Sequence, residues 1–273
     1  MRLLFAVVVL GSCTYGQTVA GVKIVQHTET KTTGVPGMAW PEERTIISYA
    51  QGSNRRTEFP LESLRNVPPM KMILIQRCDT RVIYSLNPDK REYTETHSPS
   101  PKEEAKARQE TQRKWSEGPP NLVIESTTVD TGETKYAFGH TARHYVTTIK
   151  ETPAPELGQQ PSEIVQDAWY LDVPDVTTCE PVSRRPRGLI VASVSGGEIR
   201  KLRPKFTYSG PEPQGMILSE KTTTRSVHVF QTGEKHNAVV TTFREIVEIL
   251  DEAIDPAIFD VPAGFTKVKQ FTR

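Results

Sequence analysis

Two histidines, His140 and His144, have the spacing that most resembles a chemical motif. On a helix, two histidines four residues apart can bind one metal ion, as they do in the H-E-x-x-H motif. Here the following residues, Tyr145-Val-Thr-Thr-Ile149, are β-branched or aromatic and predict a strand. At about 3.4 Å per residue, the two imidazoles of a strand lie on one face roughly 13 Å apart, too far to share a metal. We therefore expect partly buried or edge histidines and no metal site.

Ser195, which is followed by two glycines, comes nearest to a nucleophile motif. A nucleophile elbow needs G-x-S-x-G between a strand and a helix, whereas Ser193 stands two residues before Ser195 and no helical segment follows. Acidic pairs such as Asp172 and Asp175 sit among ordinary surface charges, and no phosphate-binding glycine pattern occurs. The sequence thus predicts a protein that is not an enzyme and that uses no cofactor.

The chain has three cysteines. Leu10-Gly-Ser-Cys13 resembles the bacterial lipoprotein box, in which the cysteine is lipidated; the alternative is that Cys13 is removed with a signal peptide. Cys78 and Cys179 then most simply form one disulfide in an oxidising compartment, and two buried free thiols are the alternative. Neither cysteine has the C-x-x-C spacing of a redox pair.

Residues 1–20 are typical of a secretory signal peptide. Arg2 is followed by the apolar run Leu3–Leu10 and by small residues, with possible cleavage after Gly16 or Ala20. The run is far shorter than the roughly 20 residues that span a bilayer; a buried first strand is the alternative. We expect export to the periplasm or outer cell envelope, with outer-membrane anchoring if Cys13 is lipidated, and a single domain over residues 21–273.

Charge and hydropathy restrict the partners of this domain. The formal net charge is +1, and basic and acidic residues are interleaved along the chain. The mean hydropathy is −0.46. Nucleic acid is therefore not an expected partner, because its binding needs a clustered basic surface.

Short β-branched runs separated by Gly, Pro and Asn turns predict about a dozen strands. Residues 71–95 have the pattern of three strands, with a turn at Asn87–Lys90. Thr131-Gly-Glu133 is expected to turn the chain. Asn237–Leu250 is expected to be one long strand, with a helix from Phe243 as the alternative.

Two segments predict helical structure. Lys102–Trp115 contains one β-branched residue and many good helix formers, which indicates a solvated helix or a lid. Asp255–Phe259 is expected to form a short helical turn. The predicted fold class is mainly antiparallel β, with a single strongly curved sheet or open half-barrel and one or two capping helices.

Apolar side chains on alternating positions of the predicted strands could line the concavity of such a sheet. The alternative is that they pack against one another as a solid core, which is the commoner case for any one residue. The candidates are Val82, Tyr84, Leu86, Val146, Trp169, Leu171, Phe206 and Met216.

Several short motifs together resemble a family of uncharacterised exported bacterial proteins with the LolA/LolB-like lipoprotein-carrier fold. They are Gln76–Asp79, Tyr84–Asn87, Tyr93, Gly139–His144, Asp167–Tyr170, Cys179 and Phe259–Phe265. The resemblance implies an unclosed curved sheet, capped by helices, around an apolar cavity that carries acyl chains. It implies no catalytic residues. The Pro-rich loop 153–161 and the single clear cap helix depart from the pattern of the family.

We therefore expect an exported cell-envelope protein that binds a lipid or another apolar ligand in the concavity of its sheet, without catalysis. The alternative is a scaffold or protein-interaction module that holds no small molecule, for which another envelope protein is the partner. Membrane association is expected only if Cys13 is lipidated.

Overall fold

The computed structural model describes residues 20–34, 43–61, 70–115, 118–179, 203–229 and 233–271. Within these ranges the chain forms a single 13-stranded sheet, one α-helix and two short 3-10 helices. Residues 1–19 of the expected signal peptide, which include Cys13, lie outside the described residues, and so does Ser195. The strand order is β10-β7-β8-β9-β11-β12-β1-β2-β3-β4-β5-β6-β13.

The strands fall into two groups along the chain. The N-terminal half is an antiparallel meander of β1 (Ala20–Thr33), β2 (Glu43–Gln51), β3 (Asn54–Leu61), β4 (Met70–Arg77), β5 (Val82–Asn87) and β6 (Glu92–His97). The C-terminal half contains β7 (Leu122–Ala137), β8 (His140–Pro153), β9 (Ser162–Leu171), β11 (Met216–Val229) and β12 (Lys235–Ala253). The edges are β10 (Pro204–Ser209), parallel to β7, and β13 (Thr266–Lys267), parallel to β6.

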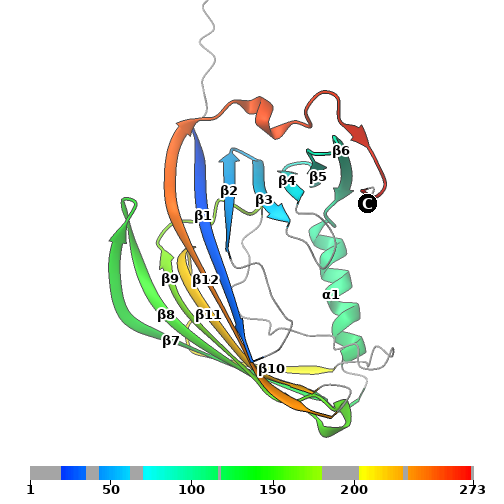
Figure 1. The fold of residues 1–273 in the computed structure, drawn as a ribbon, viewed down its shortest axis with the longest axis vertical. Helices are drawn as coiled ribbons and strands as arrows, with labels where there is room; N and C mark the ends of the chain where they lie inside the picture. Colours follow the sequence, from blue (N-terminus) through cyan, green and yellow to red (C-terminus); the bar gives the residue numbers. More distant parts are fainter. Residues whose placement is uncertain are drawn as a thin grey trace, which may run out of the picture.

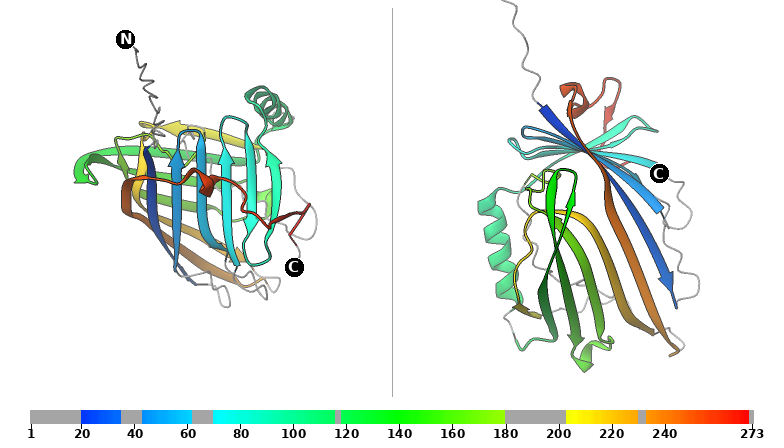
Figure 2. Two further views of the ribbon diagram at one scale, coloured as in Figure 1. Left: turned by 90° about the horizontal axis from the view of Figure 1, so that it is seen from above. Right: turned by 90° about the vertical axis from the view of Figure 1, so that its left-hand side faces the viewer.

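The sheet is strongly curved and does not close. Figure 1 shows the strands of the C-terminal half bending like a bowl, while the N-terminal half forms a layer across its top; the two layers cross in Figure 2. The pairing of β1 with β12 joins the halves. Irregular registers at Val25/Gln26 and at Ile217/Ser219 mark the bend, because bulges increase local twist. The predicted open half-barrel is confirmed.

Three clusters of buried apolar residues hold this shape. The bend cluster is Ile24, Ala142, Leu171, Met216, Leu218 and Ile246. The C-terminal cluster is Ile73, Ile75, Leu86, Ile254 and Phe259. The β7 cluster is Leu122, Ile124, Ile149 and Ile164.

The C-terminal segment covers the outer face of the N-terminal half. The 3-10 helix η2 (Pro256–Phe259) begins at Asp255, whose side chain accepts a hydrogen bond from the Ala257 N–H at 2.9 Å. Arg56 of β3 donates to the Ile258 carbonyl at 2.6 Å, and Phe259 is 1% exposed. The helical turn predicted at 255–259 is confirmed, and it seals the C-terminal cluster.

One predicted turn is instead a bulge. β7 continues through Thr131–Glu133, with a register shift between Asp130 and Thr134, and the hairpin turns at Phe138 and Gly139. The Asp130 carboxylate accepts the Gly132 N–H at 2.9 Å, which stabilises the extra residues. Phe138 and Gly139 both have positive φ, as the two-residue turns that match strand twist require.

The helix α1 (Pro101–Trp115) is solvated, as its composition predicted. Ser100 and Glu103 form a capping box: the Glu103 carboxylate accepts from the Ser100 N–H at 2.7 Å, and the Ser100 hydroxyl accepts from the Glu103 N–H. Its described side chains are exposed, apart from the half-buried Glu104. Figure 1 shows α1 beside the open side of the sheet. Among the described residues, no helix has the length and apolar character needed to cross a membrane.

Cys78 and Cys179 form the predicted disulfide, with a Cα–Cα distance of 5.1 Å. The bond joins the end of β4, in the N-terminal half, to the loop that follows β9, in the C-terminal half. A disulfide fits a protein that matures in an oxidising compartment.

Candidate functional site: the concave face of the sheet

The two faces of the C-terminal half differ sharply in burial. Side chains alternate between the faces of a strand, so each face can be followed through the register. Thr128 of β7 and its cross-strand partner Thr147 are buried, whereas the next pair on the opposite face, Val129 and Val146, includes a valine that is 53% exposed. We call the buried side the concave face and the other the convex face.

A row of polar side chains crosses the concave face. Six residues stand side by side in register, one on each of six consecutive strands of the sheet: Thr128, Thr147, Gln166, Thr222, Thr242 and Thr30. The hydroxyls of Thr128 and Thr147 lie 3.0 Å apart, and those of Thr242 and Thr30 lie 3.3 Å apart. We call this set the hydroxyl row. It makes the middle of the concave face polar.

A charged pair lies in the next row toward the bend. Glu220 of β11 stands beside Arg244 of β12, which in turn stands beside Thr28 of β1. The Arg244 guanidinium donates to the Glu220 carboxylate at 2.9 Å. The Glu220 side chain is 11% exposed and that of Arg244 is 36% exposed, so the ion pair sits on the wall of the concavity.

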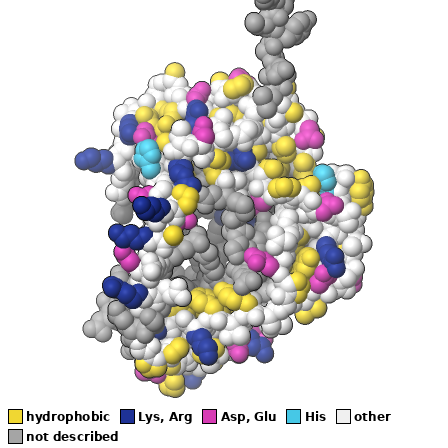
Figure 3. Space-filling model, turned by 180° about the vertical axis from the view of Figure 1, so that it is seen from behind, with side chains coloured by type: hydrophobic (Ala, Val, Ile, Leu, Met, Phe, Trp, Pro, Cys, Tyr) yellow, Lys and Arg dark blue, Asp and Glu magenta, His cyan; other side chains and the backbone are white. Residues whose placement is uncertain are grey.

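Apolar side chains flank these polar rows on both sides. Leu218 and Ile246 of the bend cluster lie toward the N-terminal half. The β7 cluster, with Phe206 of β10 packed against it, lies toward the opposite end of the strands. Figure 3 shows a hollow between the two halves, with hydrophobic side chains gathered along its lower wall. The concave face is therefore amphipathic, and an apolar lining alone does not describe it.

The eight apolar residues predicted to line the concavity are not brought together. They are divided among the C-terminal cluster (Tyr84 and Leu86), the bend cluster (Trp169, Leu171 and Met216), the β7 cluster (Phe206), the convex face (Val146) and a half-buried position in β5 (Val82). The register of β5 with β4 turns Tyr84 and Leu86 toward η2, away from the concave face. Polarity alternation predicted these strands but not which face each one buries.

A pocket of about 590 Å³ opens where β9 begins, because β11 and β12 extend past the first paired residue of β9. Most of its wall area is apolar, but its lining includes the ion pair of Arg225 with Glu163 at 3.2 Å. Glu151 is 8% exposed there and accepts a hydrogen bond from the Ser162 hydroxyl at 2.8 Å. The pocket is a second concave feature at the rim of the sheet.

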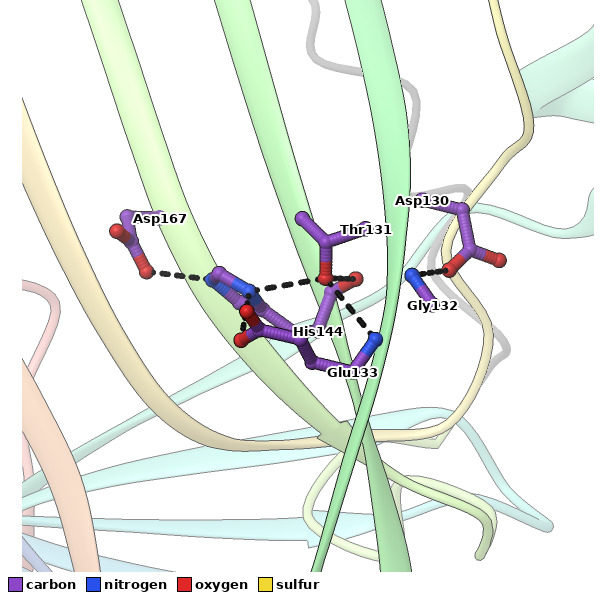
Figure 4. A network of polar contacts seen from close by, with 6 residues as sticks. All are labelled: Asp130, Thr131, Gly132, Glu133, His144 and Asp167. Carbon is purple, nitrogen blue, oxygen red and sulfur yellow. Dashed lines mark hydrogen bonds and ion pairs between the residues drawn. The ribbon is translucent and has the colours of Figure 1, made fainter.

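His144 is the centre of a polar network on the convex face (Figure 4). Its Nε2 lies 2.9 Å from Asp167, and its Nδ1 lies 3.1 Å from the Thr131 hydroxyl and 3.3 Å from Glu133. The ring stacks on Trp169 at 4.7 Å between centroids. These contacts hold the β7 bulge against β8 and β9.

The histidines do lie on a strand, as predicted, since β8 begins at His140. No group of three or more potential metal ligands occurs within the described ranges. His140 is 3.7 Å from Asp172, away from the network of His144.

Sequence reasoning missed the polar rows. The signal for these rows in the sequence is the alternation of threonines at Thr28, Thr30 and Thr32. Threonines on one face of a strand pair with hydroxyls across the sheet, which is a recognised cross-strand pairing.

No family model and no curated protein matches the chain. Two crystal forms of PNGF-II match in structure with TM-scores of 0.34 and 0.36, at 11% and 10% identity; each match covers 91% of this chain and 30% or 31% of the other. A structure titled for lipid–protein interactions in lipovitellin matches with a TM-score of 0.31 at 7% identity, over 86% of this chain and 26% of the other. The chain thus spans under a third of the length of these proteins. With TM-scores this low, the matches assign no activity and no ligand to this chain.

Proposed function

We propose that this protein is a non-catalytic binding protein of the cell envelope that holds an amphipathic ligand with an acyl chain in the concavity of its sheet. The observation that carries the proposal is the concave face itself. Apolar clusters lie at both ends of its strands, and a band of hydroxyl and charged groups lies between them. A curved open sheet of this kind offers one continuous surface to both parts of such a ligand.

The resemblance of several sequence motifs to the lipoprotein-carrier fold supports the same proposal. So does the Cys78–Cys179 disulfide, which fits an exported protein. Export to the periplasm or outer envelope, and anchoring through Cys13, belong to this proposal.

The test is binding of a fluorescent 16-carbon acyl probe to the lipid-extracted mature protein, together with native mass spectrometry before extraction. We expect an acyl species to co-purify and the probe to bind. Ile149→Thr, on the concave face, should weaken probe binding about tenfold because it removes apolar contact area. Val146→Thr, on the convex face of the same strand, is the matched control and should leave binding unchanged. Absence of any acyl species and of probe binding in the folded wild type would rule the function out.

A scaffold role is the second candidate, and one observation favours it. At the β7–β8 hairpin, Tyr136 is 76% exposed and Phe138 is 41% exposed, so two aromatic side chains stand in solvent on one tip. Exposed aromatic groups are enriched in protein interfaces. If a Tyr136→Ser/Phe138→Ser variant loses an envelope partner that the wild type retains, while the acyl probe fails to bind either protein, this role replaces the carrier function.

A further inference from the structure

On two neighbouring strands of the concave face, buried polar atoms lack a hydrogen-bond partner among the described residues. Two of these atoms are Oγ1 of Thr28 and Nε of Arg244. Thr28 as a whole residue is only 4% exposed. A buried polar group without a partner costs free energy, and native proteins satisfy almost all such groups with protein, water or ligand.

The register places these two atoms on neighbouring residues. Thr28 and Arg244 are direct partners in the pairing of β1 with β12. The hydroxyl of Thr32, farther along the same face of β1, is a third buried polar atom without a partner. Of the six such atoms among the described residues, three therefore lie on the β1–β12 part of the concave face, beside the hydroxyl row. The other three belong to Asn54, Arg55 and Glu151.

We propose that Thr28 and Arg244 anchor the uncharged, oxygen-bearing head of the ligand, such as the ester and hydroxyl groups of an acylglycerol. This proposal rests on the proposed function. The Arg244 Nε–H and the Thr28 hydroxyl are both donors, so they fit an acceptor oxygen. The Arg244 side chain as a whole is 36% exposed, so part of its guanidinium faces the concavity.

Local charge selects an uncharged head over a carboxylate. Glu220 already neutralises Arg244 at 2.9 Å, so the row offers hydrogen bonds without net positive charge. A ligand carboxylate would add a third charge to this neutralised pair and leave a net negative charge on a partly buried surface, which costs desolvation free energy. An ester or hydroxyl oxygen adds no such charge.

The tail of the ligand has an adjacent apolar surface. Ile246 is two residues from Arg244 on β12, and Ile24 is four residues from Thr28 on the same face of β1; both belong to the bend cluster. Head and tail of one acyl ester are thus accommodated by neighbouring rows of the same strands.

The experiment compares 1-monomyristoylglycerol with myristate, which share a chain length, as competitors of the fluorescent acyl probe. The variants are Thr28→Val, which removes the hydroxyl and keeps the shape, and Arg244→Lys, which keeps the charge beside Glu220 but removes Nε. Thr223→Val, on the convex face of β11, is the matched control. Each variant should weaken monomyristoylglycerol about tenfold and change the affinity of the acyl probe little. The control should change neither.

Thermal unfolding provides a second readout that separates binding from folding. Without ligand, Thr28→Val should be at least as stable as the wild type, because it removes a buried hydroxyl that has no partner. It should lose most of the stabilisation that monomyristoylglycerol gives the wild type.

The remaining outcomes are distinct. Unchanged monomyristoylglycerol affinity in both variants, with the acyl probe still bound, overturns the anchor and leaves an ordered water as the partner of these atoms. Tighter binding of myristate, weakened by the same variants, overturns the uncharged head. A wild type that binds no acyl compound overturns the proposed function, and the anchor falls with it.

Discussion

Single residues in this protein act mainly by fixing one segment against another. Glu58 of β3 is the clearest case: it accepts hydrogen bonds from Arg56 at 2.8 Å and from Lys71 of β4 at 2.6 Å. Arg56 also donates to the Ile258 carbonyl of η2. One carboxylate thereby links two strands and, through Arg56, the C-terminal segment.

The ionisation of Glu58 predicts a pH dependence of stability. Burial alone would raise the pKa of Glu58, but the hydrogen bonds and charges of Lys71 and Arg56 outweigh burial and hold this pKa below its usual value. A carboxylate with a lowered folded-state pKa stabilises the fold above its unfolded pKa of about 4.3, and the contribution is lost as the pH falls through the folded pKa.

We expect Glu58→Gln to lower the free energy of unfolding at pH 7, by an amount that shrinks progressively below about pH 4 as the wild-type carboxylate is protonated. Urea unfolding between pH 7 and pH 3 measures both proteins. Glu125→Gln, at an exposed position of β7, serves as the control and should follow the wild type. A Glu58→Gln deficit that stays constant down to pH 3 would contradict the argument.

At the scale of elements, local pattern predicted most strands, the solvated helix and the turn at η2. The long strand expected at 237–250 is part of β12, which extends from Lys235 to Ala253. Local pattern did not reveal which strands are neighbours. β10 pairs in parallel with β7 and β12 pairs with β1, and such contacts depend on packing between segments that are distant in sequence. The candidate site was missed for the same reason, since its polar rows exist only across strands.

The segment after β10 approaches β7 closely, and this gives a prediction about glycine. Gly210 has φ +85, and a Cβ there would lie 1.8 Å from the Thr128 carbonyl oxygen. Gly132, in the β7 bulge, has φ +78 but no atom within 4 Å of a Cβ. Both positions disfavour a side chain by conformation, but only Gly210 also forbids it by contact.

Gly132→Ala should therefore cost about 1 kcal/mol of unfolding free energy, from backbone conformation alone. Gly210→Ala should cost clearly more, because the backbone must move away from Thr128. Urea unfolding of the two variants tests the difference. If both variants lose the same unfolding free energy, the segment after β10 can move away from β7 without loss of stability, and the argument from contact is wrong.

At the scale of the whole molecule, the two halves are joined by the β1–β12 pairing and by the disulfide. Cys78 and Cys179 are 101 residues apart in sequence. A crosslink that closes a loop of about 100 residues reduces the entropy of the unfolded chain and is worth about 4.7 kcal/mol in the chain-entropy model.

We expect the Cys78→Ser/Cys179→Ser variant to lose about 4 kcal/mol of unfolding free energy relative to the oxidised wild type. The wild type in a reducing buffer should approach the stability of the variant, while the variant itself should not respond to the reductant. A variant as stable as the oxidised protein would show that the bond is incidental to the fold.

The pairing of β1 with β12 also dictates when this protein can fold. Ala20 stands opposite Ala253, so β1 completes its pairing only after β12 has been synthesised. Folding rates fall as contacts join residues far apart in sequence, because the intervening loop must close first. An incomplete chain therefore lacks the strand that unites its halves. The two halves of the sheet are therefore united late in folding, and we expect slower folding than for a chain of this size that is built from local contacts.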